Sequence, residues 1–236
     1  LNLLDNLRYI FIHKNLKKRY NISKSKCVVL DDAVELEDFK SKPKPLKSCV
    51  YTGSFVKGKG IELIIKIAKL CPKIKFYAYG NINTLEKINN FKEIKNLIFM
   101  NYIDYSKVPK VLKKNLILLM PYQKKISILA KNIYVQNYFS PLKLFEYLAS
   151  GNIIIASKLP VYNHILKNNH NSVLCDPNNP REWSIQINKI LSNPHKYRYL
   201  SKNSFQTAKK YTWFNRAKRI LNFAKKINWT CILLKI

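Results

Sequence analysis

The stretch SPLKLFEYLASGNIIIASKLP, residues 140–160, contains a helix, a turn and a strand in immediate succession. Ser140 is a favourable N-cap, Pro141 suits the first helical turn, and Gly151 suits the residue that follows a helix. The run Ile-Ile-Ile-Ala that comes next has the length and β-branched composition of a buried strand. The stretch therefore predicts a helix over 142–150 followed by a strand, the repeating unit of an α/β sheet.

The same alternation extends outward in both directions. Expected strands cover 49–51, 75–79, 97–100, 116–120, 153–156 and 173–175, and expected helices cover 61–70, 84–91, 108–113, 142–150, 161–166, 182–191 and 214–226. Strands and helices that take turns form βαβ units and a parallel sheet with helices on both faces. The predicted fold class is α/β, a Rossmann-like open parallel sheet.

The start of the chain does not follow this alternation. Apolar residues recur at helical spacing over 3–20 and predict a helix there, and the short apolar run at 27–30 predicts a strand. Two prolines among lysines at 41–45 indicate a linker between domains. Further on, residues 122–138 lack a clear period and predict a long loop beyond a strand end, where an open α/β sheet holds its ligand.

The composition is that of a globular chain. Its 236 residues, 47% of them hydrophobic, suffice for one sizeable core and a second small unit. No stretch reaches the roughly 18 to 20 consecutive apolar residues of a membrane-spanning helix, and the first residues do not resemble an export signal. The five cysteines are widely spaced and are expected to be buried thiols in a reducing cytosol. We expect a cytoplasmic protein, dissolved or peripheral to the membrane.

The formal net charge of +30 at pH 7 admits three interpretations. Clustered lysines neutralise the phosphates of a nucleic acid, but here they are spread over the whole chain and no known recognition motif is present. A basic surface also attracts anionic lipid headgroups. The abundance of Asn and Ile beside Lys favours a compositional bias that AT-rich coding alone produces. We expect no nucleic-acid partner, and peripheral contact with an anionic membrane stays a hypothesis.

A glycine-rich turn, YTGSFVKGKG at residues 51–60, joins the first strand of the alternation to its helix. Glycines let the backbone approach a ligand, the helix N-terminus offers free N–H donors, and a lysine reaches an anionic oxygen. A diphosphate is the natural ligand for such a turn. The alternative is an ordinary turn in a lysine-rich chain, since the spacing matches neither a dinucleotide fingerprint nor a P-loop.

Glu146 is the acidic residue of the otherwise apolar helix predicted at 142–150. It lies about one turn past the helix start, where its carboxylate could reach a ligand across that end. A buried carboxylate without a partner is costly. The alternative is that Glu146 faces solvent or pairs with a neighbouring lysine.

These residues resemble a known family, the group 1 (family 4) retaining glycosyltransferases of GT-B fold. The resemblance is strongest at 140–160 and continues in order through four further segments and an upstream one. They are VYTGSFVKGKGIELII from Val50, NLIFMNYIDYSKVPKVLKKNLILLMPY from Asn96, NSVLCDPNNPREWSIQI from Asn171, YTWFNRAKRIL from Tyr211 and VVLDDAVELEDF from Val28. Together they span nearly the whole chain.

The resemblance implies a site for a nucleotide-sugar donor, with UDP or GDP as the nucleotide. Lys59 would contact the diphosphate with Gly53 and Ser54 beside it. The backbone amides of Leu142 and Lys143, just after Ser140, would receive the distal phosphate. Glu146 would bind the ribose hydroxyls, and Lys59 and Glu146 are the expected catalytic residues. The complete set of expected donor-binding residues is Gly53, Ser54, Lys59, Ser140, Leu142, Lys143 and Glu146.

The implied reaction moves a sugar to a glycan or lipid-linked glycan acceptor with retention, without a metal or another cofactor. A place in cell-surface polysaccharide or lipopolysaccharide assembly is expected. By resemblance, residues 1–42 are a remnant of the acceptor-side domain with its linker, 43–210 form the donor-binding domain, and 211–236 form a helix that crosses back.

Three departures from the family leave a second hypothesis open. Tyr138 stands where the family often has the first carboxylate of a Glu-x7-Glu pair, and Ser54 stands where an arginine is common. Only about 40 residues resemble the N-terminal domain, which spans roughly 150 or more in a complete enzyme. The second hypothesis is a donor-domain fragment that binds a nucleotide sugar but does not catalyse its transfer by itself. A third, weaker hypothesis is a basic nucleic-acid-binding protein.

Overall fold

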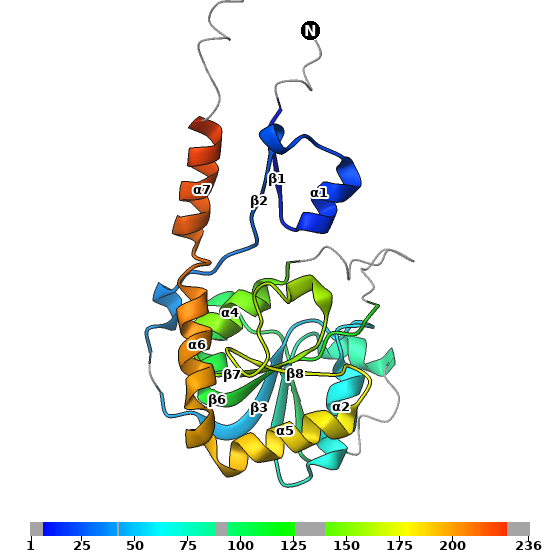
Figure 1. The fold of residues 1–236 in the computed structure, drawn as a ribbon. Coiled ribbons are helices and arrows are strands. Elements are labelled where there is room, and N and C mark those ends of the chain that lie inside the picture. Colours follow the sequence, from blue (N-terminus) through cyan, green and yellow to red (C-terminus); the bar gives the residue numbers. More distant parts are fainter. Residues whose placement is uncertain (1–6, 42, 88–93, 126–139, 226–236) are drawn as a thin grey trace, which may run out of the picture.

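A six-stranded parallel sheet organises the larger part of the molecule (Figure 1). The structure, a computed structural model, describes residues 7–41, 43–87, 94–125 and 140–225. The strands are β3 (Leu46–Thr52), β4 (Phe76–Tyr79), β5 (Leu97–Met100), β6 (Asn115–Met120), β7 (Ile153–Ser157) and β8 (Val173–Cys175). Across the sheet they stand in the order β5-β4-β3-β6-β7-β8, and every neighbouring pair is parallel. All six strands predicted from the sequence are confirmed.

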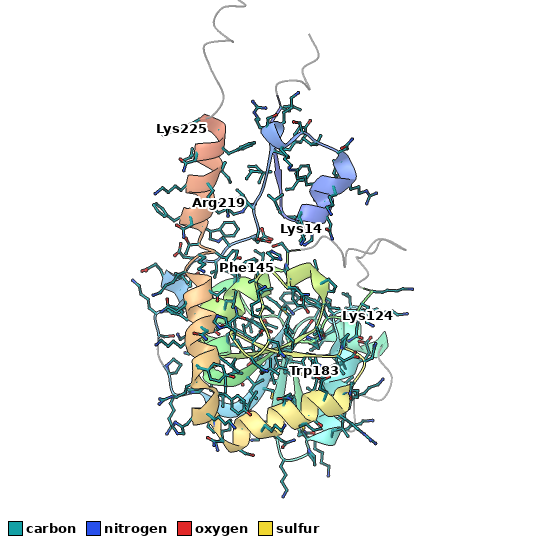
Figure 2. The ribbon with its side chains drawn as sticks, in the orientation of Figure 1. Lys14, Lys124, Phe145, Trp183, Arg219 and Lys225 are labelled. Carbon is teal, nitrogen blue, oxygen red and sulfur yellow. The ribbon has the colours of Figure 1, made fainter. Side chains whose placement is uncertain are left out.

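Helices cover both faces of this sheet, as predicted. Cys49 and Tyr51 of β3 pack into one core cluster, whereas Val50 between them packs into the other, because successive side chains of a strand point to opposite faces. One cluster lies under α2 (Ile61–Leu70) and α5 (Pro180–Ser192), and the other under α3 (Val108–Lys114), α4 (Leu142–Ser150) and α6 (Arg198–Ala208). Figure 2 shows Trp183 and Phe145, one from each cluster, within the body of the molecule.

The chain reverses its direction of progress across the sheet at β3. From β3 it moves outward to β4 and β5, and it then returns to the other side of β3 for β6, β7 and β8. Open α/β sheets bind ligands outside the carboxyl ends of their strands at such a reversal. The ends of β3 and β6 therefore mark the expected place of a ligand.

The first described residues form a small separate sheet. Strand β1 (Tyr9–Phe11) pairs in parallel with β2 (Cys27–Val29), and α1 (Lys14–Tyr20) connects them. The prediction of one helix over 3–20 was therefore wrong for residues 9–11, where pairing with β2 overrides the helical spacing. Figure 1 shows α7 (Trp213–Lys225) at the same end of the molecule as this small sheet, and a bridge between Val34 and Thr212 joins the segments that lead to both.

Two further helix predictions needed correction, and one helix was missed. The expected helix at 161–166 is only a 3-10 turn, Pro160–Tyr162, and the described part of the one expected at 84–91 belongs to a 3-10 helix, Ile82–Lys87. Helix α6 was missed because only Leu200, Ser204 and Ala208 of its eleven residues are buried, which leaves a weak apolar period. No helix among the described residues is long and apolar enough to cross a membrane.

Candidate functional site

A cavity of about 420 Å³ opens at the carboxyl edge of the sheet, beside the reversal at β3. Its walls come from the ends of β3 and β4, from the segment after β5 and from the start of α4. The lining residues are Thr52, Gly53, Tyr79, Gly80, Tyr102, Ile103, Tyr105, Val108, Leu142, Lys143 and Glu146. Four segments that are distant in the sequence therefore meet where the fold class predicts a ligand.

Helix α4 presents an uncapped N-terminus to this cavity. Pro141 is its N-cap residue and cannot cap with a side chain, so the prediction that Ser140 caps the helix was wrong. The Ser140 hydroxyl instead accepts a hydrogen bond from the backbone N–H of Asp32, at 3.1 Å. The N–H groups of Leu142 and Lys143 have no hydrogen-bond acceptor among the described residues, and such groups at a helix start favour an anion.

Glu146 lies one turn into α4 and is buried, with 9% of its surface exposed. Burial raises the pKa of its carboxyl group, and the nearby Lys143 ammonium and a hydrogen bond with the Tyr105 hydroxyl partly offset this rise. The Tyr105 phenol donates that bond to the carboxylate. The alternative that Glu146 simply faces solvent is wrong. Its carboxylate is held at the cavity wall, where it can accept hydrogen bonds from hydroxyl groups of a ligand.

The glycine-rich turn is fixed against the ends of two neighbouring strands. A β-carbon on Gly80 would lie 2.4 Å from the carbonyl oxygen of Gly53, and one on Gly60 would lie 1.9 Å from that of Pro121. The backbone N–H of Gln123 donates to the Gly58 carbonyl at 2.8 Å. The turn packs backbone to backbone against the ends of β4 and β6, which glycine permits and larger residues would not.

Two lysine side chains approach the same side of the site. The Lys143 ammonium is buried and lies 3.8 Å from the centre of the Tyr51 ring. Burial lowers its pKa strongly and the Lys59 charge lowers it further, whereas Glu146 opposes both effects. Partial burial also lowers the pKa of Lys59. Both shifts disfavour the charged amines, and an anion bound beside them would favour the charged forms.

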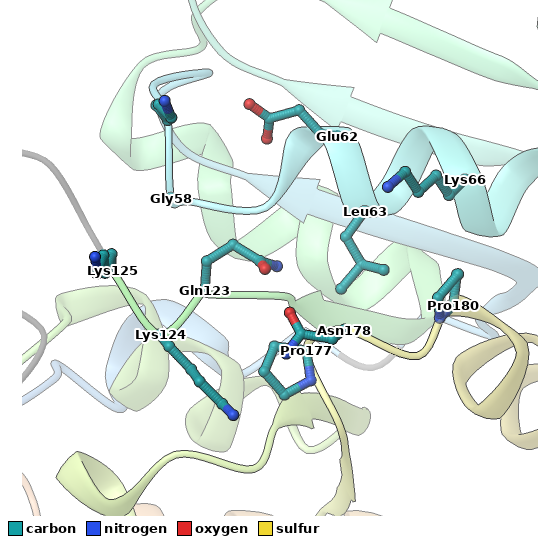
Figure 3. A pocket seen from close by; sticks show the side chains of 11 residues that line it. Gly58, Glu62, Leu63, Lys66, Gln123, Lys124, Lys125, Pro177, Asn178 and Pro180 are labelled. Atoms are coloured by element: carbon teal, nitrogen blue, oxygen red, sulfur yellow. The ribbon is translucent and has the colours of Figure 1, made fainter.

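A second cavity, of about 580 Å³, borders the same turn. Figure 3 shows lysine side chains from the turn, from α2 and from the segment after β6 around it, with one carboxylate. The lining residues are Lys57, Gly58, Glu62, Leu63, Lys66, Gln123, Lys124, Lys125, Pro177, Asn178 and Pro180. Gly58 lines this cavity and Gly53 lines the first, so the glycine-rich turn borders both.

The structure brings together most residues that the sequence analysis assigned to one site. Gly53, Leu142, Lys143 and Glu146 line the first cavity, and Lys59 acts on Lys143 through its charge. Ser54 is not part of the lining, and its carbonyl accepts a hydrogen bond from the Tyr51 hydroxyl at 2.9 Å. Tyr134, Tyr138 and Phe139, for which the sequence favours packing within the loop over a border to the sugar, lie outside the described residues.

The opposite wall of the cavity was not predicted from the sequence. Tyr79 is the last residue of β4 and Gly80 follows it, and Tyr102 and Tyr105 follow β5. The signal was available, because residues just after parallel strands gather at the same edge of the sheet. In the part of the chain that the structure describes, no group of three or more His, Cys, Asp or Glu side chains gathers as a metal site would require.

Comparison with known proteins agrees with this geometry. The profile of the family "Glycosyl transferases group 1" matches residues 34–207, which include Lys59 and every residue of the first cavity. The chain belongs to the group 1 glycosyltransferases. A glycosyltransferase of Methanocaldococcus jannaschii is similar to this group 1 chain, with 23% identity over 164 residues. The match covers 70% of this chain and 44% of that protein, so the chain spans less than half the length of this relative.

Solved structures share the fold of this group 1 chain. A glycosyltransferase from Rickettsia africae superposes with a TM-score of 0.75 at 14% identity, over 95% of this chain and 64% of that one. Anabaena HepE, in complex with UDP-glucose, gives a TM-score of 0.74 at 11% identity, over 93% and 64%. The C-terminal domain of LpcC, a group 1 protein from Francisella tularensis, gives 0.55 at 18% identity, over 77% and 96%. The fold is thus the Rossmann-like arrangement of GT-B glycosyltransferases.

Proposed function

We propose that this chain is the donor-binding part of a glycosyltransferase that moves a sugar from a nucleotide sugar to an acceptor with retention. One observation carries the proposal: Glu146, Lys143 and Gly53 meet around a single cavity at the uncapped start of α4. A carboxylate that accepts hydrogen bonds, the Lys59 ammonium and the amide groups at the start of α4 suit the hydroxyl groups and phosphates of a nucleoside diphosphate. The UDP-glucose bound in Anabaena HepE, which has the same fold, supports this donor class.

The proposed donor lies across the carboxyl edge of the sheet. Its ribose hydroxyls donate to Glu146, and the Tyr105 hydroxyl holds that carboxylate in place. Its base lies against the aromatic side of the cavity, where Tyr79 and Tyr102 offer ring faces. Its diphosphate reaches Lys59 and the amide groups of Leu142 and Lys143. UDP or GDP fits this arrangement.

The proposed reaction breaks the bond between the anomeric carbon and the diphosphate oxygen. Negative charge grows on the diphosphate as the sugar leaves, so cations and amides fixed there stabilise the transition state more than the ground state. The acceptor hydroxyl forms its bond on the face from which the leaving group departs, and its proton passes to the diphosphate. The configuration at the anomeric carbon is thereby retained.

The remaining parts of the proposal concern the acceptor and the division of the chain. We propose a glycan or lipid-linked glycan as acceptor, reached at the membrane surface, in cell-surface polysaccharide or lipopolysaccharide assembly. Residues 1–42 would belong to the acceptor-side domain and 43–210 to the donor domain, with 211–236 crossing back. The match to an isolated C-terminal domain from Francisella tularensis supports such a division. Catalysis would need no metal, because protein cations neutralise the diphosphate.

Calorimetric titration with UDP, GDP, UDP-glucose and GDP-mannose tests the donor site. We expect one nucleotide to bind and both Lys59→Ala and Glu146→Ala to weaken it by about tenfold or more. Lys189→Ala is the control, because it removes an exposed lysine of α5 and leaves the cavity intact. Titration in EDTA should give the same affinity. A folded chain that binds none of the four ligands would contradict the proposal.

A second candidate function is donor binding without turnover by this chain alone. The observation that favours it is length, since the chain covers only 44% of its Methanocaldococcus relative and 64% of two solved structures. Slow hydrolysis of the bound nucleotide sugar distinguishes the two candidates. Release of the free sugar, abolished by Glu146→Ala, indicates a competent centre, whereas tight binding without release indicates a binding module.

A further inference from the structure

The Lys143 ammonium is the one buried side-chain nitrogen in the described residues that has no hydrogen-bond partner. It points at the glycine-rich turn, where a β-carbon on Gly53 would lie 2.6 Å from it. Aromatic rings surround the rest of the group, with the centre of the Tyr51 ring at 3.8 Å and that of the Tyr122 ring at 5.3 Å. The ammonium therefore sits at the phosphate end of the cavity without an anion in hydrogen-bond contact.

A buried lysine in such surroundings destabilises the fold. An amine that loses water without gaining hydrogen bonds costs free energy, and a methionine would fill the same space without this penalty. The carboxylate that acts on it, Glu146, also takes a hydrogen bond from Tyr105, and the Lys59 charge repels it. The burial of the Lys143 amine and its lack of a hydrogen-bond partner suggest that it binds an anion.

We propose that the Lys143 side chain is a second cation for the diphosphate of the donor, acting together with Lys59. This inference rests on the proposed function and goes beyond the role of the Lys143 backbone amide. The side chain and the uncapped amides at the start of α4 would then hold the same phosphates from two directions. The diphosphate gives the protonated lysine an anionic hydrogen-bond acceptor, which the protein groups around it do not supply.

Proton uptake follows from this geometry. Burial and the Lys59 charge disfavour the protonated form of Lys143 in the empty site, and Glu146 favours it. Tyr51 from β3 and Tyr122 after β6 also face the group, and burial raises the pKa of both phenols, so they stay neutral. A diphosphate that arrives at this site adds two negative charges, which draws a proton onto Lys143.

The first test compares UDP with uridine on the full chain and on Lys143→Met, with GDP and guanosine as the parallel pair. Methionine keeps the unbranched stem and removes the charge. We expect the variant to lose about ten- to a hundredfold in affinity for the diphosphate and to keep its affinity for the nucleoside. Lys189→Met, on the exposed face of α5, controls for net charge and should keep both affinities.

The second test measures proton uptake with UDP-glucose and GDP-mannose, whose diphosphates do not titrate near neutral pH. Calorimetry in buffers of different ionisation enthalpy should detect uptake by the full chain and a smaller uptake by Lys143→Met. A thermal melt of the variant shows that it folds. Its Tm should exceed that of the full chain at pH 7, and the difference should shrink as pH rises toward 10.5, the ordinary pKa of lysine.

The outcomes separate the two proposals. Equal affinities of the full chain and a folded Lys143→Met for the diphosphate would overturn the inference and leave the donor site standing. Equal losses for nucleoside and diphosphate would also overturn it, because they indicate a structural role. Failure of every nucleotide to bind the full chain would overturn the proposed function and the inference together.

Discussion

The Tyr147 hydroxyl of α4 accepts a hydrogen bond from the backbone N–H of Thr52 at 3.1 Å, where β3 ends. The same hydroxyl donates to the carbonyl of Leu119 on β6, at 3.3 Å. These two strands flank the reversal in the sheet, and Gly53 is the next residue after Thr52. One buried phenol therefore sets the position of the glycine-rich turn relative to the helix that carries Lys143 and Glu146.

Removal of this hydroxyl should weaken both the fold and the site. In Tyr147→Phe the Thr52 N–H loses its partner, and a buried donor left unsatisfied costs about 1–3 kcal/mol in free energy of unfolding. Urea denaturation measures that loss, and calorimetry should show weaker binding of the nucleotide. Tyr162→Phe is the control, since its buried hydroxyl bonds to the Ser157 carbonyl and does not line the cavity. Equal effects of both variants on binding would contradict the argument.

The close approach of the turn to β6 gives a prediction about two glycines. Gly60 and Gly151 both have left-handed backbones, with φ of 92° and 68°. A β-carbon on Gly60 would collide with the Pro121 carbonyl, whereas one on Gly151 would meet nothing closer than 3.7 Å. In both alanine variants backbone strain should lower the free energy of unfolding by about 1–2 kcal/mol. Chemical denaturation should show a clearly larger loss of this free energy for Gly60→Ala than for Gly151→Ala, and only Gly60→Ala should lose nucleotide binding.

The raised pKa of Glu146 predicts that its carboxylate lowers folding stability while it strengthens nucleotide binding. Because the folded state holds the proton to higher pH than the unfolded chain does, folding stability falls as pH rises from 4.5 through the raised pKa. Glu146→Gln does not titrate, so its Tm should exceed that of the unsubstituted chain at pH 7 and match it near pH 4. Its nucleotide affinity should fall by about tenfold. A lower Tm at pH 7 would show that the carboxylate stabilises the empty fold.

The sheet and α4 could be predicted from the sequence because their signals are local. Each strand is a short apolar run, and α4 has Gly151 after its last turn. Strand β1 could not be predicted in this way. Its three residues belong to a stretch with helical spacing of apolar residues, and they form a strand only because they pair with β2. Each of its residues pairs with one that lies eighteen positions further on, and no local pattern carries that information.

The candidate site could be predicted in part for the same reason. Lys59 and Glu146 stand in motifs that carry their own chemistry, whereas Tyr105 becomes a partner of Glu146 only when β5 and α4 come together. The Lys143 side chain was overlooked in favour of its backbone amide. A lysine in an apolar helix suggests an exposed residue, and only the packing of Tyr51 and the turn shows that it is buried. Ser140 was misassigned because Asp32 competes for its hydroxyl.

His13 joins the small N-terminal sheet to the main body and predicts a loss of order in acid. Its Nδ1 accepts the Asn15 N–H at 3.2 Å at the start of α1, so Nε2 carries the proton and faces the Val161 carbonyl at 3.0 Å. Burial lowers its pKa below 6.5, the His164 and Lys14 charges add to this, and the Val161 bond and Asp31 oppose it.

Since the unfolded chain binds a proton more readily, stability is lost as pH falls below 6.5. NMR titration should place the His13 pKa below that value, and the hydrogen-exchange protection factors of the α1 amides should fall in acid. His13→Asn, which can still cap the helix, should remove this pH dependence; a pKa above 6.5 would refute the argument.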